Sequence, residues 1–116
     1  IGQIGTPGYA GYGASKAGLN AIVRIFAAEV APRVRVNGVA PGAVDTAFIR
    51  GGYAEGAAVS GEPERFSVDE YQKRVPMGRL AQSDDVVGPM LFLLSENARY
   101  ITGQVLHVNG GAFMRD

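Results

Sequence analysis

Residues 12–46 read YGASKAGLNAIVRIFAAEVAPRVRVNGVAPGAVDT, and this stretch decides the fold class. Its apolar residues recur at steps of three and four from Tyr12 to Val30, which predicts a helix. The apolar positions cover more than one stripe, so this helix needs partners on two sides. Pro32 ends it, and Val34–Ala40 follows as a predicted strand buried on both faces, as in a parallel sheet. Helix, tight turn and strand form the second half of a βαβ unit.

Glycine and proline interrupt residues 43–80. We expect short helices at 45–50 and 68–74, within a connection that is long for a compact domain. Connections of this length tend to be lids or binding loops.

The last third of the chain predicts one more helix and one more strand. The helix should run from Asp84 to about Ser95 with Ser83 as its N-cap, and Pro89 should kink it or delay its start. The strand should cover Gln104–Val108 and end at a glycine-rich turn.

Composition excludes several classes of protein. The 116 residues include 11 Lys and Arg against 11 Asp and Glu, which argues against an electrostatic nucleic-acid or membrane-surface binder. Cys is 0, so there is no disulfide framework and no Cys-based zinc site, and the single His107 cannot form a His-rich metal cluster. We expect no signal peptide at the start, and no apolar run approaches the roughly 18 residues that a membrane span needs. We expect a cytoplasmic protein with no metal site.

Tyr12 and Lys16 are four residues apart, so they point to the same side of the predicted helix. An ammonium beside a phenol favours the phenolate. A tyrosine tuned in this way can exchange a proton with an alcohol or a carbonyl oxygen near neutral pH. The alternative is an incidental pair on a solvated helix face.

The strand Val34–Ala40 ends abruptly at Pro41-Gly42. In open α/β sheets, ligands bind beyond the carboxyl ends of the strands. Residues 41–46 are therefore a candidate ligand loop, and an ordinary strand-end turn is the alternative.

These two features, in this order and spacing, resemble the classical short-chain dehydrogenase/reductase family. Residues 7–46, PGYAGYGASKAGLNAIVRIFAAEVAPRVRVNGVAPGAVDT, are similar to its active-site helix, the next strand and the nicotinamide-side loop. Residues 78–111, GRLAQSDDVVGPMLFLLSENARYITGQVLHVNGG, are similar to its last helix, last strand and closing turn. The resemblance implies an α/β fold with a doubly wound, Rossmann-like parallel sheet, of which this chain holds the last two strands.

The resemblance also implies an activity and its residues. The protein would be an NAD(P)-dependent oxidoreductase that transfers a hydride between the nicotinamide of NAD or NADP and a secondary alcohol or ketone. Tyr12 matches the catalytic acid/base, and Lys16 matches the lysine that favours the phenolate and hydrogen-bonds the nicotinamide ribose. Together with these two, the cofactor-binding residues would be Pro41, Gly42, Val44 and Thr46, which match the loop that holds the nicotinamide ring and its carboxamide.

Partners follow from the same resemblance. The helix Tyr12–Val30 matches one that packs against its copy in another subunit, so a homo-oligomer, dimer or tetramer, is expected. Residues 47–80 match the variable substrate loop, but their composition leaves the substrate open among acyl thioesters, sugars, steroids and small cyclic alcohols. His107, within the last predicted strand, is expected to be structural, and Asp84-Asp85 are expected to serve a helix N-terminus.

Several family features do not occur in these 116 residues. There is no G-x-G-x-x-G fingerprint, and no Ser precedes Tyr12. We therefore expect residues 1–116 to be the C-terminal half of a single domain, inactive alone and unable to bind NAD or NADP. Two other interpretations stay open. One is a non-catalytic remnant or oligomerisation module, and the other is an extended-family epimerase or dehydratase, which also uses Tyr and Lys four apart.

Overall fold

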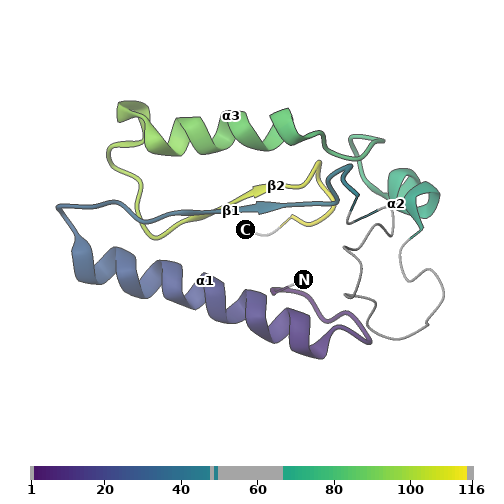
Figure 1. Ribbon diagram of the computed structural model, residues 1–116, viewed down its shortest axis with the longest axis horizontal. Helices are drawn as coiled ribbons and strands as arrows, with labels where there is room; N and C mark the ends of the chain where they lie inside the picture. The colour runs from purple at the N-terminus through teal and green to yellow at the C-terminus, as the bar shows by residue number, and fades with distance from the viewer. Residues whose placement is uncertain (1, 48, 50–66, 115–116) are drawn as a thin grey trace. The chain divides into compact units, whose positions relative to one another are not determined.

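The computed structural model describes residues 2–47, 49 and 67–114. They form two compact units, Ile1–Val39 with Met90–Leu106 and Ala40–Pro89 with His107–Asp116, called here the first and the second unit. In chain order the elements are α1 (Ala10–Val30), β1 (Gly38–Pro41), α2 (Val68–Arg74), α3 (Ser83–Leu94), the 3₁₀ turn η1 (Glu96–Ala98) and β2 (Val105–Val108) (Figure 1). No helix among the described residues is long and apolar enough to cross a membrane.

The sheet consists of β1 and β2, which run parallel. The Gly38 amide donates to the Gln104 carbonyl at 2.8 Å, and the Gly42 amide donates to the Val108 carbonyl at 3.0 Å. Because the two partners advance together along the chain, the strands point the same way. Helix followed by parallel strand is the α/β arrangement expected from the sequence.

The first unit packs α1 on the strands through small residues. A Cβ added at Gly103 would lie 3.4 Å from the Ala27 Cβ, and Ala27 is the buried residue of α1. Arg35 holds the end of α3, because its guanidinium donates to the carbonyls of Leu93 at 2.7 Å and Ser95 at 3.3 Å.

The predicted strand Val34–Ala40 is shorter in the structure, where pairing begins at Gly38. Before that point the Gly103 amide donates to the Val36 carbonyl at 2.8 Å, and the other bonds involve side chains. The Val36 amide donates to Thr102 Oγ1 at 3.1 Å, and the Asn37 amide group donates to Ile101 and accepts from the Gln104 amide. Burial on both faces is also wrong, since β1 is half-buried and then exposed, with β2 as its one strand neighbour among the described residues.

The second unit has a small core of Ala43, Val75 and Leu80. The helix predicted at 68–74 is confirmed as α2, and its N-cap Ser67 accepts a hydrogen bond from the Glu70 amide. A helix at 45–50 is not observed. The described part of that stretch is a turn in which the Ile49 amide donates to the Thr46 carbonyl at 3.1 Å, and residues 48 and 50 lie outside the described residues.

Two details of the predicted helix at Asp84–Ser95 differ in the structure. Ser83 is the first residue of α3 rather than its cap, and Pro89 lies inside the helix without delaying its start. The Asp85 carboxylate takes the capping role, because it accepts from the Gln82 amide at 2.7 Å. The last strand begins at Val105, one residue later than predicted.

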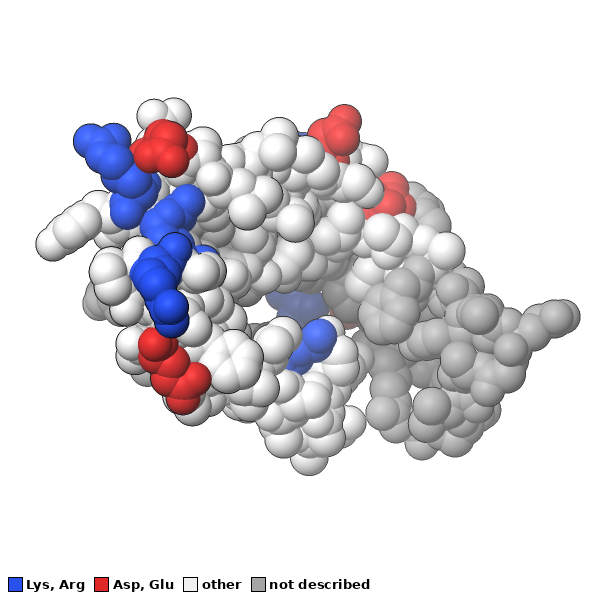
Figure 2. Space-filling view, turned by 60° about the vertical axis from the view of Figure 1, so that its left-hand side comes forward, with Lys and Arg blue, Asp and Glu red and all other residues white. Residues whose placement is uncertain are grey.

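Apolar side chains remain exposed in both units. On α1 these include Leu19 (52%), Ile22 (45%), Ile25 (52%) and Phe26 (51%). Figure 2 shows Lys and Arg gathered mainly on the left of the view, with an uncharged surface over much of the rest of the described part. Uncharged surface of this kind is typical of faces that other protein surfaces cover.

Candidate functional site

Tyr12 and Lys16 lie on consecutive turns of α1, in the first unit. The Lys16 Nζ lies 5.2 Å from the centroid of the Tyr12 ring, and 46% of Tyr12 is exposed. The same-side placement predicted for this pair is thus present. The exposed phenol can reach a molecule outside the helix, and the Lys16 ammonium lies over the face of its ring.

The residues around this pair serve the helix. Ser15 Oγ donates to the Tyr12 carbonyl at 2.7 Å, so the serine between Tyr12 and Lys16 satisfies the backbone. The Tyr9 ring packs edge-on against the Tyr12 ring, with centroids 6.4 Å apart and an interplanar angle of 76°. This contact fixes the direction of the phenol from the side of the loop that precedes α1.

The loop after β1 lies in the second unit, and most of its backbone amides have partners. Gly42 donates to Val108, Asp45 donates to Ala81 at 2.8 Å, and the Ala43 carbonyl accepts from Ala81 at 3.0 Å. Within the part of the chain that the structure describes, the Val44 amide donates no hydrogen bond. An amide held by bonded neighbours but unused itself is a donor available to a ligand.

The remaining predicted loop residues flank this amide. Pro41 ends β1 and is exposed, and Gly42 begins the loop. Thr46 is exposed, and its Oγ1 donates to the Val44 carbonyl at 3.3 Å. The structure therefore brings the four predicted loop residues together in one short turn.

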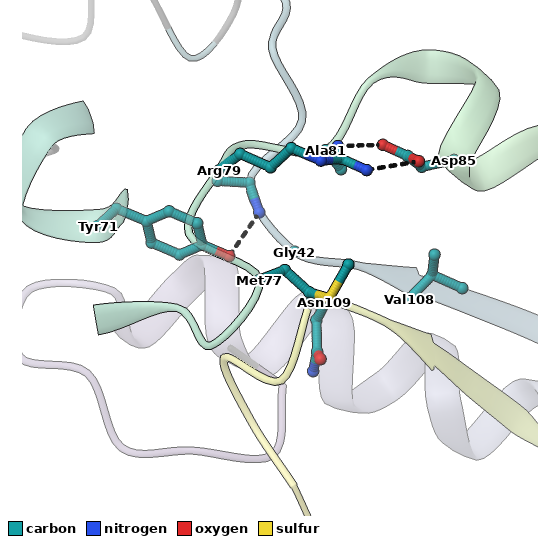
Figure 3. A pocket seen from close by; sticks show the side chains of 10 residues that line it. Gly42, Tyr71, Met77, Arg79, Ala81, Asp85, Val108 and Asn109 are labelled. Atoms are coloured by element: carbon teal, nitrogen blue, oxygen red, sulfur yellow. Dashed lines mark hydrogen bonds and ion pairs between the residues drawn. The ribbon is translucent and has the colours of Figure 1, made fainter. Parts of the chain in front are cut away.

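A cavity of about 180 Å³ lies beside this loop, between it, α2 and the turn after β2 (Figure 3). Tyr71, Met77 and Asn109 line it together with Gly42. The Tyr71 hydroxyl accepts a hydrogen bond from the Ala43 amide at 3.1 Å. Sequence reasoning missed this contact. The sequence places Tyr71 only within the helix predicted at 68–74, and no local pattern links two residues 28 positions apart.

Arg79 and Asp85 form a two-bonded ion pair at the same cavity (Figure 3). The distances are 2.6 Å from Nη1 to Oδ2 and 3.0 Å from Nη2 to Oδ1. Hydrogen bonds from Arg79, and then from the Gln82 amide, lower the pKa of Asp85 to about 2. The carboxylate is therefore ionised near neutral pH and tied to its partners, so it serves the helix N-terminus, as expected, rather than proton transfer.

His107 has a structural environment. Its ring packs edge-on against Phe113, with centroids 5.5 Å apart. The turn that follows β2 is held by the Asn109 side chain, which donates to the Phe113 carbonyl at 2.7 Å and accepts from the Gly111 amide at 3.0 Å.

Comparison with known proteins decides the family. A family model described as enoyl-(acyl carrier protein) reductase matches residues 1–112. The chain belongs to the short-chain dehydrogenase/reductase family. It is 40% identical over 114 residues to the 3-oxoacyl-(acyl-carrier-protein) reductase FabG of Aquifex aeolicus, and 38% identical over 115 residues to that of Staphylococcus aureus strain Mu50.

A solved structure of another short-chain dehydrogenase/reductase supports this family assignment. A protein of Brucella melitensis described as short-chain dehydrogenase/reductase SDR: glucose/ribitol dehydrogenase superposes with a TM-score of 0.82 at 30% identity. The alignment covers 98% of this chain and 42% of that one. The alignments with the two FabG relatives cover 97% and 98% of this chain, and each covers 42% of the relative's own length. The expected α/β, Rossmann-like fold class is thus confirmed for a chain that spans less than half of each relative.

Proposed function

We propose that the protein carrying this chain is an NAD(P)-dependent oxidoreductase acting on a ketone or the corresponding secondary alcohol. The observation that carries the proposal is the exposed Tyr12 phenol with the Lys16 ammonium 5.2 Å from its ring, in a member of a family of reductases. The Val44 amide, which donates to none of the described residues, supports it, because the nicotinamide carboxamide oxygen is an acceptor that such a donor fits.

In this proposal the chain's own residues supply position and the proton. The cofactor supplies the hydride. Tyr12 gives its hydroxyl proton to the carbonyl oxygen during reduction and takes it back from the alcohol during oxidation. Lys16 keeps its ammonium beside the Tyr12 ring and donates to the nicotinamide ribose. The amide of Val44 donates to the carboxamide, and Pro41, Gly42 and Thr46 shape the loop around the ring.

For the substrate we propose a 3-oxoacyl thioester. Support comes from the printed names of the FabG relatives, which are 3-oxoacyl-(acyl-carrier-protein) reductases. The glucose/ribitol name of the structural neighbour gives the competing class, a polyol. Activity of the natural-length protein with 3-oxobutanoyl-CoA and with ribitol separates them.

Substitution of Tyr12 tests the mechanism. In the natural-length protein, Tyr12→Phe should keep dinucleotide affinity and lose roughly 10²–10⁴-fold in turnover, because the ring remains and the proton is lost. Tyr100→Phe is the matched control, since Tyr100 is 100% exposed. Lys16→Met should lower both turnover and cofactor affinity. Normal turnover in Tyr12→Phe would refute the proposal.

A homo-oligomer built on α1 is part of the proposal. The sheet side of this helix carries Val23 and Ala27, whereas Leu19, Ile22 and Phe26 are exposed on another side. A second copy of the same helix would remove these apolar side chains from water.

A non-catalytic oligomerisation module remains the alternative. It predicts that the natural-length protein binds no dinucleotide. The 116-residue chain by itself should bind neither NAD nor NADP under either proposal, because it has no glycine-rich pyrophosphate turn. Calorimetric titration of both proteins with each cofactor distinguishes the two functions.

A further inference from the structure

The loop after β1 is held partly by backbone and partly by one side chain. Gly42 and Asp45 donate to main-chain carbonyls of β2 and of the segment before α3. The Ala43 amide instead donates to the Tyr71 hydroxyl, on α2. Ala43 itself is 9% exposed, so this amide cannot exchange its partner freely for water.

The position of the Tyr71 hydroxyl is restrained by the packing of α2. Its own carbonyl accepts from the Val75 amide at 2.9 Å, and Val75 is only 4% exposed, which anchors the end of α2 in the core of the second unit. A tyrosine ring has two side-chain torsions, so a half-buried ring leaves the hydroxyl little freedom. Figure 3 shows the ring lying along the cavity with its hydroxyl toward the loop.

Because Gly42 has no side chain, the Tyr71 hydroxyl can approach the loop closely. A Cβ there would lie 2.7 Å from Tyr71 Oη. A side chain at Gly42 would therefore crowd the Tyr71 hydroxyl, which bonds the next amide, that of Ala43. The Val44 amide, the unused donor, follows directly after the amide that Tyr71 holds.

We propose that Tyr71 is a positioning residue that presents the Val44 amide to the nicotinamide end of the cofactor, and so links α2 to cofactor affinity. This inference rests on the proposed function. The role assigned to the phenol needs no contact with cofactor or substrate. It acts through the Ala43 amide, and removing the hydroxyl lets the loop leave the geometry in which Val44 can donate.

The test compares two ligands of the natural-length protein, in Tyr71→Phe and in the control Tyr100→Phe. One is NADH or NADPH. The other is ADP-ribose, or its 2′-phosphate for an NADP enzyme, which lacks the nicotinamide. Tyr71→Phe should raise the dissociation constant of the dinucleotide about 3- to 10-fold, the usual effect of one hydrogen bond, and leave that of ADP-ribose unchanged. Amide hydrogen exchange at Ala43 should quicken.

Three results overturn the inference. Equal weakening of both ligands by Tyr71→Phe would indicate a general structural role. Unchanged dinucleotide affinity would remove the link to the cofactor, and unchanged exchange at Ala43 would remove the hydrogen bond. If the unsubstituted protein binds neither dinucleotide, the proposed function itself fails and the cofactor role of Tyr71 with it. That outcome differs from the others because it appears before any substitution is made.

Discussion

Gly42→Ala tests whether the loop and α2 are fitted to each other. The new Cβ would lie 2.7 Å from Tyr71 Oη and 3.0 Å from the Asn109 Cα. Ordinary contact begins at 3.4 Å, so the hydroxyl must retreat by about 0.7 Å. That retreat breaks its 3.1 Å hydrogen bond with Ala43, at about 0.5–1.5 kcal/mol, and the crowding against Asn109 adds about 1–3 kcal/mol. The free energy of unfolding should therefore fall by about 1.5–4.5 kcal/mol.

A double-mutant cycle with Tyr71→Phe separates these two effects. In the Tyr71→Phe background there is no hydroxyl to displace, so Gly42→Ala should cost about 0.5–1.5 kcal/mol less than in the unsubstituted protein. Urea unfolding of the four proteins measures this, with Gly18→Ala as the control, because a Cβ at Gly18 meets no atom within 4 Å. Effects of Gly42→Ala and Tyr71→Phe that add within about 0.5 kcal/mol would refute the fitted contact.

Three further outcomes are expected. Because the pKa of Asp85 is lowered to about 2, its ion pair with Arg79 stabilises the fold above the ordinary carboxylate pKa of 3.8 and stops doing so as pH falls through about 2. The difference in unfolding free energy between the unsubstituted protein and Asp85→Asn should thus shrink between pH 4 and 2, and a constant difference would contradict it. Arg35→Met, which removes three hydrogen bonds to main-chain carbonyls, should cost about 1.5–3 kcal/mol in urea unfolding, and no cost would mean these bonds are absent in solution. Ile22→Glu, on the exposed apolar side of α1, should dissociate the proposed oligomer in light scattering. Arg24→Glu, on another side of the helix, should leave it intact. An intact oligomer in both variants would show that α1 is not at the interface.

Local features of this chain could be predicted from its sequence because few residues determine them. Helix geometry alone places Tyr12 beside Lys16, and the structure has them on one side of α1. Ser67 and the acidic residues after it define α2, whose bounds match the prediction.

Features that depend on distant residues could not be predicted in this way. Val34 and Val36 give residues 34–37 the pattern of a strand. Their neighbours at 101–104 turn at Gly103, with φ +73°, so side chains of Asn37 and Thr102 make most of the bonds there. The contact of Tyr71 with Ala43 joins residues 28 apart, and neither residue type marks it. For the same reason the sequence predicts a candidate ligand loop but gives no sign of the side chain that holds it.

The parallel pairing of the two strands has a consequence for synthesis of the chain. Thr102, which bonds Val36 just before the ladder, lies 66 residues later in the sequence. At roughly 5–20 residues per second, a ribosome adds that segment in roughly 3–13 s, whereas a helix forms in about a microsecond. α1 is therefore synthesised seconds before β2, so Ala27 gains its contact at Gly103 only after that delay. Slower translation of residues 37–102 would lengthen the interval in which Val36 lacks Thr102 as its partner.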